Sequence, residues 1–381
     1  MTVSVTPPPI LETSGVDPDQ ALLRLPLVLR FADGSGLQLP DWPAPLDVLT
    51  GILGTRGWRW SDRVALLRTA MGWRRAGFAC APDATVAALC RALPPRLLAE
   101  FIEPLCVAAL NTPIAEASGP VFLRVLHDAL LGGRGHSNLL LPRVDLGALF
   151  PHAAARWLAQ RGAAVRTGQR IDALHWQAPH WRVGQQDFDR VIWATSAFNA
   201  VPALVQSAQT APNVVASDML AWSTTAAGLT HRAITTVYAQ AAATPASDRL
   251  LPAPMLALRS GPEAPAQFVF DRDAITRPAD PTGLLAFVVS DSGGERAALE
   301  AAVVMQARRE LGLAVRPLLT ITERRATFAC TAGLQRPPAA IAPALLACGD
   351  FIVGPYPATL EGAVRSGIDA VRAATAPPAL G

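Results

Sequence analysis

Hydrophobic and polar positions in the first half of the chain follow first a strand-like and then a helix-like pattern. Two apolar segments between residues 25 and 39, separated by the sequence DGSG at 33–36, predict a β-hairpin. From about residue 47 to 131, leucine-rich stretches broken by proline and glycine predict a series of helices. Residues 146–160 predict one more helix, which we expect to end at Arg161-Gly162.

The second half of the chain mixes strands and helices without an internal repeat. An apolar strand over 189–194 ends at the polar pair Thr195-Ser196. A buried strand over 344–348 leads through a loop to a helix that begins near Thr359. Other short stretches predict strands at 164–166, 170–174, 181–183, 234–239, 267–270 and 284–290. The pattern favours the α/β fold class.

The changes of pattern near residues 141 and 201 divide the chain into two interleaved domains. We expect one domain to comprise 142–200 and 338–376, and the other to comprise 20–141 and 201–337. Residues 1–19 are rich in proline and polar side chains, so this N-terminus is expected to be poorly ordered.

Composition and charge exclude several classes of protein. Half of the 381 residues are hydrophobic and 17% are charged, which is typical of a globular protein. The chain contains no lysine, so all 33 basic residues are arginines. The net charge of +3 is spread without a basic run, which argues against a nucleic-acid partner.

Cysteine usage and hydropathy indicate the compartment. The five cysteines are far apart and form no CxxC pair, which argues against a disulfide framework or a zinc site and predicts that no metal is bound. No apolar run reaches the length of a membrane span, and no signal peptide is recognisable. We therefore expect a cytoplasmic protein that is soluble or lies at the inner face of the membrane.

The segment from 345 to 371 carries the strongest chemical signal. An apolar strand ends at Gly349-Asp350, where open α/β sheets bind ligands, and the helix that follows presents its N-terminus to an anionic group. We expect its large apolar residues to pack on the core and its small residues to form the opposite stripe. The large set is Leu360, Val364, Ile368 and Val371, and the small set is Gly362, Ala363, Ser366, Gly367 and Ala370. A turn and tight packing explain either feature alone, but the two together favour a cofactor site.

This segment resembles the C-terminal flavin motif of the amine oxidase and phytoene desaturase superfamily. Three further segments make the resemblance more specific, to squalene-associated FAD-dependent desaturases and hydroxysqualene dehydroxylases. The four motifs are PLCVAALNTP at 104–113, LLLPRVDLG at 139–147, RRATFA at 324–329 and YPATLEGAVRSG at 356–367. The resemblance covers nearly all of the chain after residue 20.

The resemblance implies an FAD-binding domain interleaved with a substrate domain of mixed sheet and helices. It places Gly349 and Asp350 at the FAD ribityl chain and pyrophosphate, Ile171 at the adenine, and Thr195 at the end of a strand beside the cofactor. The isoalloxazine would be covered by Thr359, Leu360, Glu361, Gly362 and Ala363. It implies reduction of hydroxysqualene to squalene in squalene and hopanoid biosynthesis, with squalene-synthase-like enzymes as partners and peripheral membrane contact.

One part of the family pattern is missing. The GxGxxG turn of the family's opening strand–turn–helix unit is absent, and the chain enters the pattern at about Val16. We therefore expect a Rossmann-like domain that lacks its first βαβ unit, as in a fragment or a truncated gene product; a separately encoded N-terminal piece is the alternative. The Gly132-Gly133-Arg134-Gly135 cluster is expected to be a loop.

Several alternatives remain open. They are a carotenoid or phytoene-type desaturase, an inactive remnant, and an accessory subunit that binds lipid or a partner enzyme. An amine oxidase is less favoured because such enzymes usually place a lysine near the flavin. The catalytic acid is unknown, with Arg143, Asp145, Glu323 and Arg324 as candidates. We expect a long apolar pocket and look for its lining in 201–337, at Val237, Met255, Leu256, Phe268, Phe270, Phe287 and Val288.

Overall fold

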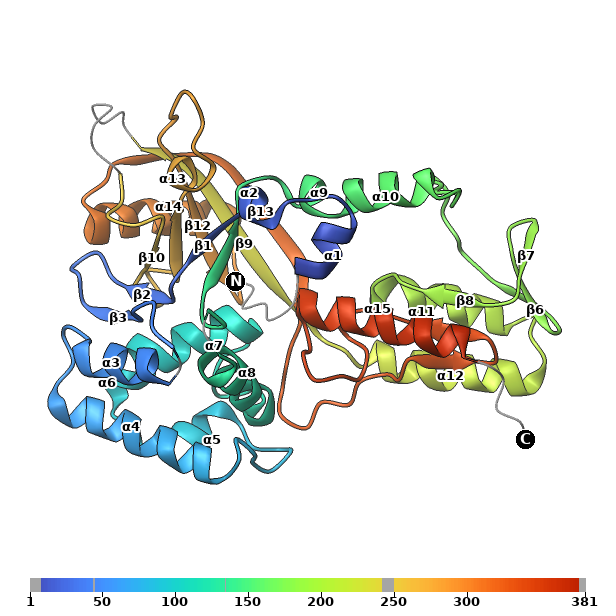
Figure 1. The fold of residues 1–381 in the computed structure, drawn as a ribbon, viewed down its shortest axis with the longest axis horizontal. Helices are drawn as coiled ribbons and strands as arrows, with labels where there is room; N and C mark the ends of the chain where they lie inside the picture. Colours follow the sequence, from blue (N-terminus) through green and yellow to red (C-terminus); the bar gives the residue numbers. More distant parts are fainter. Residues whose placement is uncertain (1–7, 44, 134, 242–249, 377–381) are drawn as a thin grey trace. The chain divides into compact units, whose positions relative to one another are not determined.

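Two compact units make up the chain (Figure 1). The computed structural model describes residues 8–43, 45–133, 135–241 and 250–376. Unit 1 comprises residues 1–163 and 231–333, and unit 2 comprises residues 164–230 and 334–381. Because each unit is assembled from two separate stretches of sequence, its strands meet through long-range pairing.

Two segments lie in a different unit from the one that the sequence pattern indicated. Residues 142–163 belong to unit 1, where β4 (Leu139–Pro142) pairs antiparallel with β1 (Leu22–Leu25). Residues 201–230 belong to unit 2, where the Trp222 Nε1–H donates a hydrogen bond of 2.8 Å to the Pro338 carbonyl. Both partners are more than a hundred residues away in sequence, so a local pattern does not reveal them.

An antiparallel sheet of five strands forms the core of unit 1. In spatial order its strands are β10 (Met255–Ala257), β11 (Phe268–Asp271), β12 (Leu284–Ser290), β9 (His231–Ala241) and β13 (Val315–Phe328). Along β9, Val237 and Ala239 are fully buried while Tyr238 between them is half-buried, as the two-residue period of a strand requires. Val303 of α14 (Arg296–Gln306) belongs to the same buried cluster, so this helix covers one face of the sheet.

Helices form most of the rest of unit 1, and polar caps explain where two of them begin. The Thr85 hydroxyl accepts from the Ala88 N–H, and the Ser118 hydroxyl accepts from the Val121 N–H. These two residues cap α5 (Val86–Cys90) and α8 (Gly119–Leu131). The other helices of the unit besides α14 are α1 (Pro8–Thr13), α2 (Pro18–Ala21), α3 (Leu46–Gly54), α4 (Trp60–Arg75), α6 (Pro95–Leu97), η1 (Leu98–Ile102), α7 (Glu103–Leu110), α9 (Leu146–Leu149), α10 (Pro151–Gln160), α13 (Arg272–Thr276) and η2 (Ala307–Leu311). The prediction of a helical region over 47–131 is confirmed.

The predicted hairpin and the predicted helix over 146–160 have different outcomes. The hairpin is confirmed, since β2 (Val28–Arg30) pairs antiparallel with β3 (Gly36–Gln38). A Cβ atom at Gly36 would lie 2.2 Å from a backbone oxygen, so only glycine fits this turn. The prediction of one helix over 146–160 is wrong in one respect. Two helices, α9 and α10, are separated at Phe150, because the residue before a proline avoids helical backbone angles.

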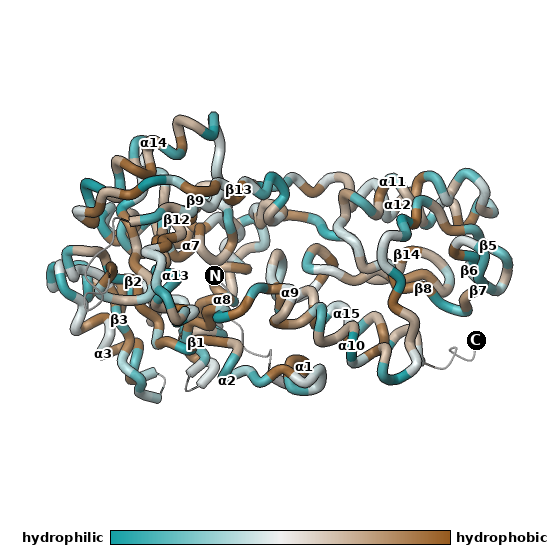
Figure 2. Tube along the Cα trace, turned by 90° about the horizontal axis from the view of Figure 1, so that it is seen from above, coloured by the Kyte–Doolittle hydropathy of each residue, from teal (hydrophilic) through white to brown (hydrophobic). Residues whose placement is uncertain are grey.

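Unit 2 is built around two small sheets. The meander β5 (His175–Gln177), β6 (His180–Val183) and β7 (Gln186–Phe188) forms one of them. The other has the order β14 (Ala340–Ala342), β15 (Leu345–Ala347) and β8 (Val191–Trp193). Figure 2 shows the hydrophobic character of β8 and β14. Strand β15 pairs parallel with β8. The predicted strands at 164–166 and 170–174 are wrong, since these residues have no regular structure.

Three helices accompany the parallel pair, namely α11 (Ala197–Ala208), α12 (Asn213–Ala227) and α15 (Leu360–Thr375). The predicted orientation of α15 is wrong. Leu360, Ile368 and Val371 are 61%, 42% and 52% exposed, whereas Ala370 is fully buried. Ser366 reaches the end of β15, where its hydroxyl hydrogen-bonds the Gly349 backbone. Ser366 and Ala370 therefore face the sheet, because short side chains allow a helix to approach it closely, whereas Gly367 faces open space.

Candidate functional site

The carboxyl ends of β8 and β15 lie at one edge of their sheet in unit 2. Trp193 is opposite Ala347 in the parallel register, and the Cys348 N–H donates a 3.0 Å hydrogen bond to the Trp193 carbonyl. Thr195 follows the first strand, and Gly349 follows the second. The structure therefore brings these predicted cofactor residues to the same edge, which is where α/β sheets bind their ligands.

Thr195 is exposed, and its side chain already has partners within the chain. Its Oγ1 accepts a 2.6 Å hydrogen bond from the Trp193 indole N–H and donates to the Ser196 carbonyl at 3.3 Å. Because a hydroxyl has a second acceptor lone pair, it can still accept one hydrogen bond from a ligand. The indole fixes the position of this hydroxyl at the sheet edge.

Gly349 and Gly362 are required by the packing of the chain itself. A Cβ atom at Gly349 would lie 2.6 Å from the Phe351 ring, and one at Gly362 would lie 2.0 Å from the Tyr356 carbonyl oxygen. The motif resemblance implies that both glycines contact the cofactor. Their local packing is sufficient to explain both glycines, so they are weaker evidence for a ligand than their sequence motif suggests.

The first turn of α15 provides unpaired backbone donors. The Thr359 hydroxyl caps the helix by accepting from the Gly362 N–H at 3.0 Å, and the Ala363 N–H donates to the Thr359 carbonyl at 3.1 Å. In the described part of the chain, the N–H groups of Leu360 and Glu361 have no hydrogen-bond partner. Free N–H groups at the positive end of a helix dipole suit an anionic or electron-rich ligand.

The loop before α15 connects this helix end to the sheet edge. The Ala358 N–H donates to the Asp350 carbonyl at 3.2 Å, and the Gly349 N–H donates to the Ser366 hydroxyl at 2.8 Å. Both ends of the loop are thus held next to the end of β15. The predicted residues Gly349, Asp350 and Thr359–Ala363 form one continuous region.

The side chains of two predicted cofactor residues, Glu361 and Ile171, give no direct support for the contacts expected of them. The Glu361 side chain is 6% exposed and forms an ion pair with Arg365, so its carboxylate is engaged inside the unit and only its backbone remains available. Arg365 also lies over the Tyr356 ring, 5.0 Å from its centre. Ile171 is 39% exposed in a segment without regular structure, and its contact with adenine stays a prediction.

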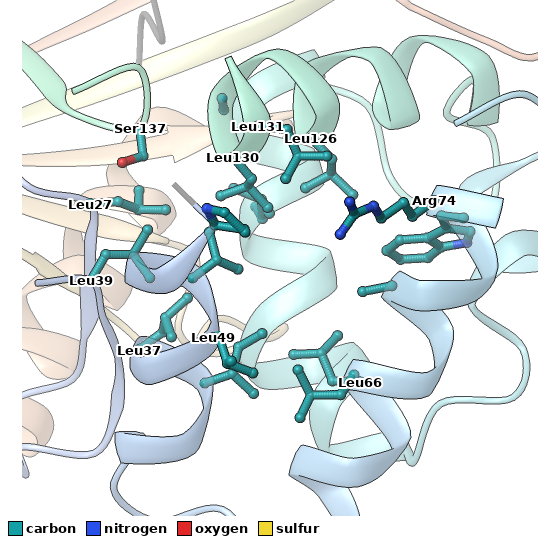
Figure 3. A pocket seen from close by; sticks show the side chains of 18 of the residues that line it. Leu27, Leu37, Leu39, Leu49, Leu66, Arg74, Leu126, Leu130, Leu131 and Ser137 are labelled. Carbon is teal, nitrogen blue, oxygen red and sulfur yellow. The ribbon is translucent and has the colours of Figure 1, made fainter. Parts of the chain in front are cut away.

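Unit 1 contains a separate candidate site, an apolar cavity of about 200 Å³. Figure 3 shows leucines of the hairpin, α3, α4 and α8 that surround one space. Three side chains in its wall carry polar groups, namely the Trp73 indole, the Arg74 guanidinium and the Ser137 hydroxyl. The apolar part of the wall consists of Leu27, Leu37, Leu39, Pro45, Val48, Leu49, Ile52, Leu66, Leu67, Ala70, Met71, Phe78, Phe101, Leu105, Ala109, Val125, Leu126, Ala129, Leu130 and Leu131.

The predicted lining residues in 201–337 are wrong for this cavity, because none of them belongs to its wall. Val237, Leu256 and Phe287 instead lie in the buried cluster between the five-stranded sheet and α14. Most of the cavity wall comes from helices between residues 46 and 131, and Leu27, Leu37 and Leu39 of the hairpin also contribute to it. The sequence pattern predicted these helices and the hairpin but not a pocket between them. The signal that could have indicated the pocket is that these helices carry more apolar positions than one buried face of a helix accommodates.

None of the four candidates for a catalytic acid lines the cavity. The Asp145 carboxylate caps α9 by accepting from the Ala148 N–H at 2.9 Å. Glu323 accepts from the Arg325 N–H, and both Glu323 and Arg324 are exposed on β13. The Arg143 guanidinium is half-buried and lies 3.5 Å from the Ile275 carbonyl.

Burial raises the pKa of several titratable groups in unit 1. Burial raises the pKa of Cys90 to about 12 and also raises the pKa of Cys106. Burial raises the pKa of Glu103, to which the nearby charge of Asp291 adds, against a backbone hydrogen bond that lowers it. Within the described residues, no group of three or more His, Cys, Asp or Glu side chains is placed to hold a metal ion.

Comparison with known proteins identifies the fold. No family model and no curated protein sequence matches the chain. An oxidoreductase from Methanosarcina mazei has a similar structure, with a TM-score of 0.63 and 15% identity over 92% of this chain and 80% of that one. Cyclohexylamine oxidase from Brevibacterium oxydans IH-35A gives a TM-score of 0.57 and 13% identity, over 93% of this chain and 82% of that one.

A third solved structure, wild-type putrescine oxidase bound to putrescine, gives a TM-score of 0.57 and 14% identity over 96% of this chain and 84% of that one. These likenesses extend through both units. The predicted α/β fold class is confirmed. The chain shares its mixed α/β fold with these solved oxidoreductase and amine oxidase structures.

Proposed function

We propose that this protein is an FAD-dependent oxidoreductase that acts on a polyprenyl lipid and converts hydroxysqualene to squalene by reductive dehydroxylation. The apolar cavity of unit 1 is the observation that carries the substrate class. A polyprenyl chain has almost no hydrogen-bonding groups, so it needs apolar walls and few polar ones. The four sequence motifs add support for this branch of the superfamily.

The sheet edge in unit 2 fits part of a flavin. The free N–H groups of Leu360 and Glu361 would bind its electron-rich atoms, and the Thr195 hydroxyl and the Asp350 carboxylate would orient its polar chain. A reduced flavin, when bound, would supply two electrons. The overall conversion breaks a C–O bond, forms a C–H bond and releases water, so it consumes two electrons and two protons. The apolar cavity walls keep bulk water from the bound hydrocarbon.

Amine oxidation is the first alternative, because two structurally similar proteins are amine oxidases. An aliphatic amine such as putrescine is a cation at neutral pH. The cavity wall contains the Arg74 guanidinium and no carboxylate, which repels a cation. The chain also has no lysine. These observations favour a neutral apolar substrate.

A second alternative, a carotenoid-type desaturase, is closer to the proposed function in its substrate, because phytoene is also a long apolar hydrocarbon. Product analysis separates the two functions. The purified chain is supplied with FAD, a reductant and hydroxysqualene, or with FAD, an electron acceptor and phytoene. Squalene is the expected product of the first mixture, and no product is expected from the second. Desaturated phytoene without squalene would reverse the assignment, and the absence of both products would favour an accessory lipid-binding subunit.

Cofactor binding is measured separately from turnover. Titration with FAD, followed by flavin fluorescence and melting temperature, tests whether the sheet edge of this chain holds a flavin. Tight stoichiometric binding would support the proposed flavin site, and no change in either signal would contradict it.

A matched pair of variants on α7 tests the cavity. Ala109 lines the cavity and Ala108 does not, and both are half-buried. Ala109→Phe is expected to reduce squalene formation by about tenfold or more because it fills the cavity, whereas Ala108→Phe should have a small effect. Equal activities of the two variants would show that the substrate binds elsewhere.

A further inference from the structure

Helices α3 and α4 expose large apolar side chains in regular positions. Leu46, Leu49 and Leu53 lie on one face of α3 and are 54%, 41% and 37% exposed. On α4, Trp60, Val64 and Met71 share one face and are 67%, 48% and 48% exposed. We call these six residues, with the arginines of the same segment, the α3–α4 surface. Contiguous exposed apolar side chains mark an interaction site.

The charge of this segment is strongly one-sided. Residues 46–75 contain six arginines and two aspartates, a net charge of +4, whereas the whole chain carries +3. Both aspartates are buried, where Asp47 accepts from the Val48 N–H and Asp62 from the Arg59 N–H. The exposed charge of the surface is therefore entirely positive.

The arginines are free to meet an external anion. Arg68, Arg74 and Arg75 are exposed and form no ion pair within the described part of the chain. Arg63 is half-buried, and its guanidinium lies 4.7 Å from the centre of the Trp60 ring while donating to the Thr55 carbonyl. Trp60 is thus presented beside a cation, a combination suited to the interface between headgroups and acyl chains.

The same surface borders the apolar cavity. Leu49, Met71 and Arg74 are exposed, and all three line the cavity (Figure 3 labels Leu49 and Arg74). The remaining wall of the cavity is almost entirely apolar. A hydrophobic ligand that crosses this rim would meet apolar side chains both outside and inside it.

We propose that the α3–α4 surface docks on an anionic lipid bilayer, so that a lipid can pass from the bilayer into the cavity. The arginines attract anionic headgroups, and Trp60, Val64 and Leu46 insert their apolar side chains below them. No helix of the described residues is long and apolar enough to cross a bilayer, so contact through these helices is peripheral. Docking stands on the surface alone, whereas the transfer of a polyprenyl substrate rests on the proposed function.

Vesicle flotation of the full chain tests the docking surface. The protein is mixed with phosphatidylcholine vesicles, with and without phosphatidylglycerol, in the absence of flavin and substrate. We expect flotation with the anionic vesicles and several-fold less with the neutral ones or in high salt. Flotation that is equal with both vesicles, or absent with both, would overturn the proposal.

Matched variants locate the contact. Trp60→Ser/Val64→Ser is expected to lower vesicle binding by at least about tenfold, because two inserted side chains are lost. Met305→Ser/Leu318→Ser is the control, since these two residues of the same unit are 63% and 48% exposed outside the α3–α4 surface. Circular dichroism confirms that each variant is folded. If both variants float equally, the membrane contact lies elsewhere and the proposal is wrong.

A second copy of the chain is the competing occupant of this surface. Light scattering of the wild type and of Trp60→Ser/Val64→Ser distinguishes the two occupants. We expect both proteins to have the same mass. A wild-type dimer that the substitutions dissociate would assign the surface to self-association and overturn docking on lipid.

The outcomes also separate docking from catalysis. Vesicle binding without conversion of hydroxysqualene leaves the docking surface in place and removes the proposed function. Conversion of detergent-dispersed hydroxysqualene without vesicle binding would support the proposed function and remove the docking surface. Loss of the proposed function and loss of the docking surface are therefore distinguishable.

Discussion

The two units of this protein bury their apolar residues to very different extents. In unit 1, a five-stranded sheet and α14 enclose a cluster in which Val237, Leu285 and Phe287 are fully buried. In unit 2, three short strands form the sheet that carries the predicted cofactor residues, and α15 leaves Leu360 and Val371 more than half exposed. Unit 1 therefore has the larger apolar core, and burial of apolar surface is the main stabilising term in folding.

The difference teaches that exposed apolar residues have separate meanings in the two units. On α3 and α4 they border a cavity and accompany unpaired arginines. On α15 they lie opposite the small residues that pack on the sheet, next to the predicted cofactor edge. We expect the first set to affect lipid contact and the second to contribute little to the stability of the isolated chain.

The largest expected effect is in the core of unit 1. Phe287→Ala should lower the free energy of unfolding by about 3–5 kcal/mol, because it leaves a cavity beneath a fully buried ring. Ile368→Ala on α15 should cost less than about 1 kcal/mol, because this side chain is 42% exposed. Urea unfolding followed by circular dichroism measures both. Equal losses would remove the contrast between the units.

A glycine pair on α15 should give the next largest effect. Gly362→Ala is expected to destabilise the protein by about 2 kcal/mol, because its Cβ would lie 2.0 Å from the Tyr356 carbonyl oxygen. Gly367→Ala has open space within 4 Å and should stabilise the helix by up to about 1 kcal/mol. The same unfolding experiment measures both variants. A neutral Gly362→Ala would show that the turn before α15 is not tightly packed.

The cap of α15 should have a smaller effect. Thr359→Ala removes the hydroxyl that accepts from the Gly362 N–H, so we expect a loss of about 1 kcal/mol. Thr359→Ser retains the oxygen and should recover most of it. Thermal melting of the three proteins measures the difference, and an unchanged melting temperature for Thr359→Ala would argue against the cap.

The smallest expected effect is a pH dependence in unit 1. Burial raises the pKa of the Glu103 carboxyl above its ordinary value of 4.5, so the folded state binds this proton more tightly than the unfolded state. The resulting stability is complete below 4.5 and is lost as pH rises through the folded pKa. Glu103→Gln should therefore gain stability relative to the wild type as pH rises.

Unfolding at a series of pH values tests this, with Glu263→Gln, an exposed carboxylate of the same unit, as the control. A relative stability of Glu103→Gln that does not vary with pH would contradict the raised pKa.

Local patterns predicted most of the elements that form the candidate sites. The hairpin at 25–39 follows from its glycine-containing turn, and the strand before Thr195 follows from its apolar run. The helix near Thr359 begins where the sequence predicted, and the structure adds that the Thr359 hydroxyl caps it. These features depend on residues close in sequence, so one chain is sufficient to show them.

Local patterns were not sufficient where a helix has two apolar faces or a strand has two buried ones. Hydrophobicity alone favours the large residues of α15 as the face that packs on the core. The structure places Ser366 and Ala370 there, since close packing and the hydrogen bonds to Gly349 decide the orientation. Likewise, the predicted lining residues Val237 and Phe287 form a core, because neighbouring elements decide what covers a strand.

By itself the sequence determined the fold class, the positions of Thr195 and Gly349 just after their strands, and a helix that begins near Thr359. Those properties come from local spacing and backbone preference. Only the tertiary structure decided that α3, α4 and α8 enclose an apolar cavity and that α15 turns its small face to the sheet. The reason is physical: which apolar face becomes buried depends on the shape and distance of partners that lie far away in the chain.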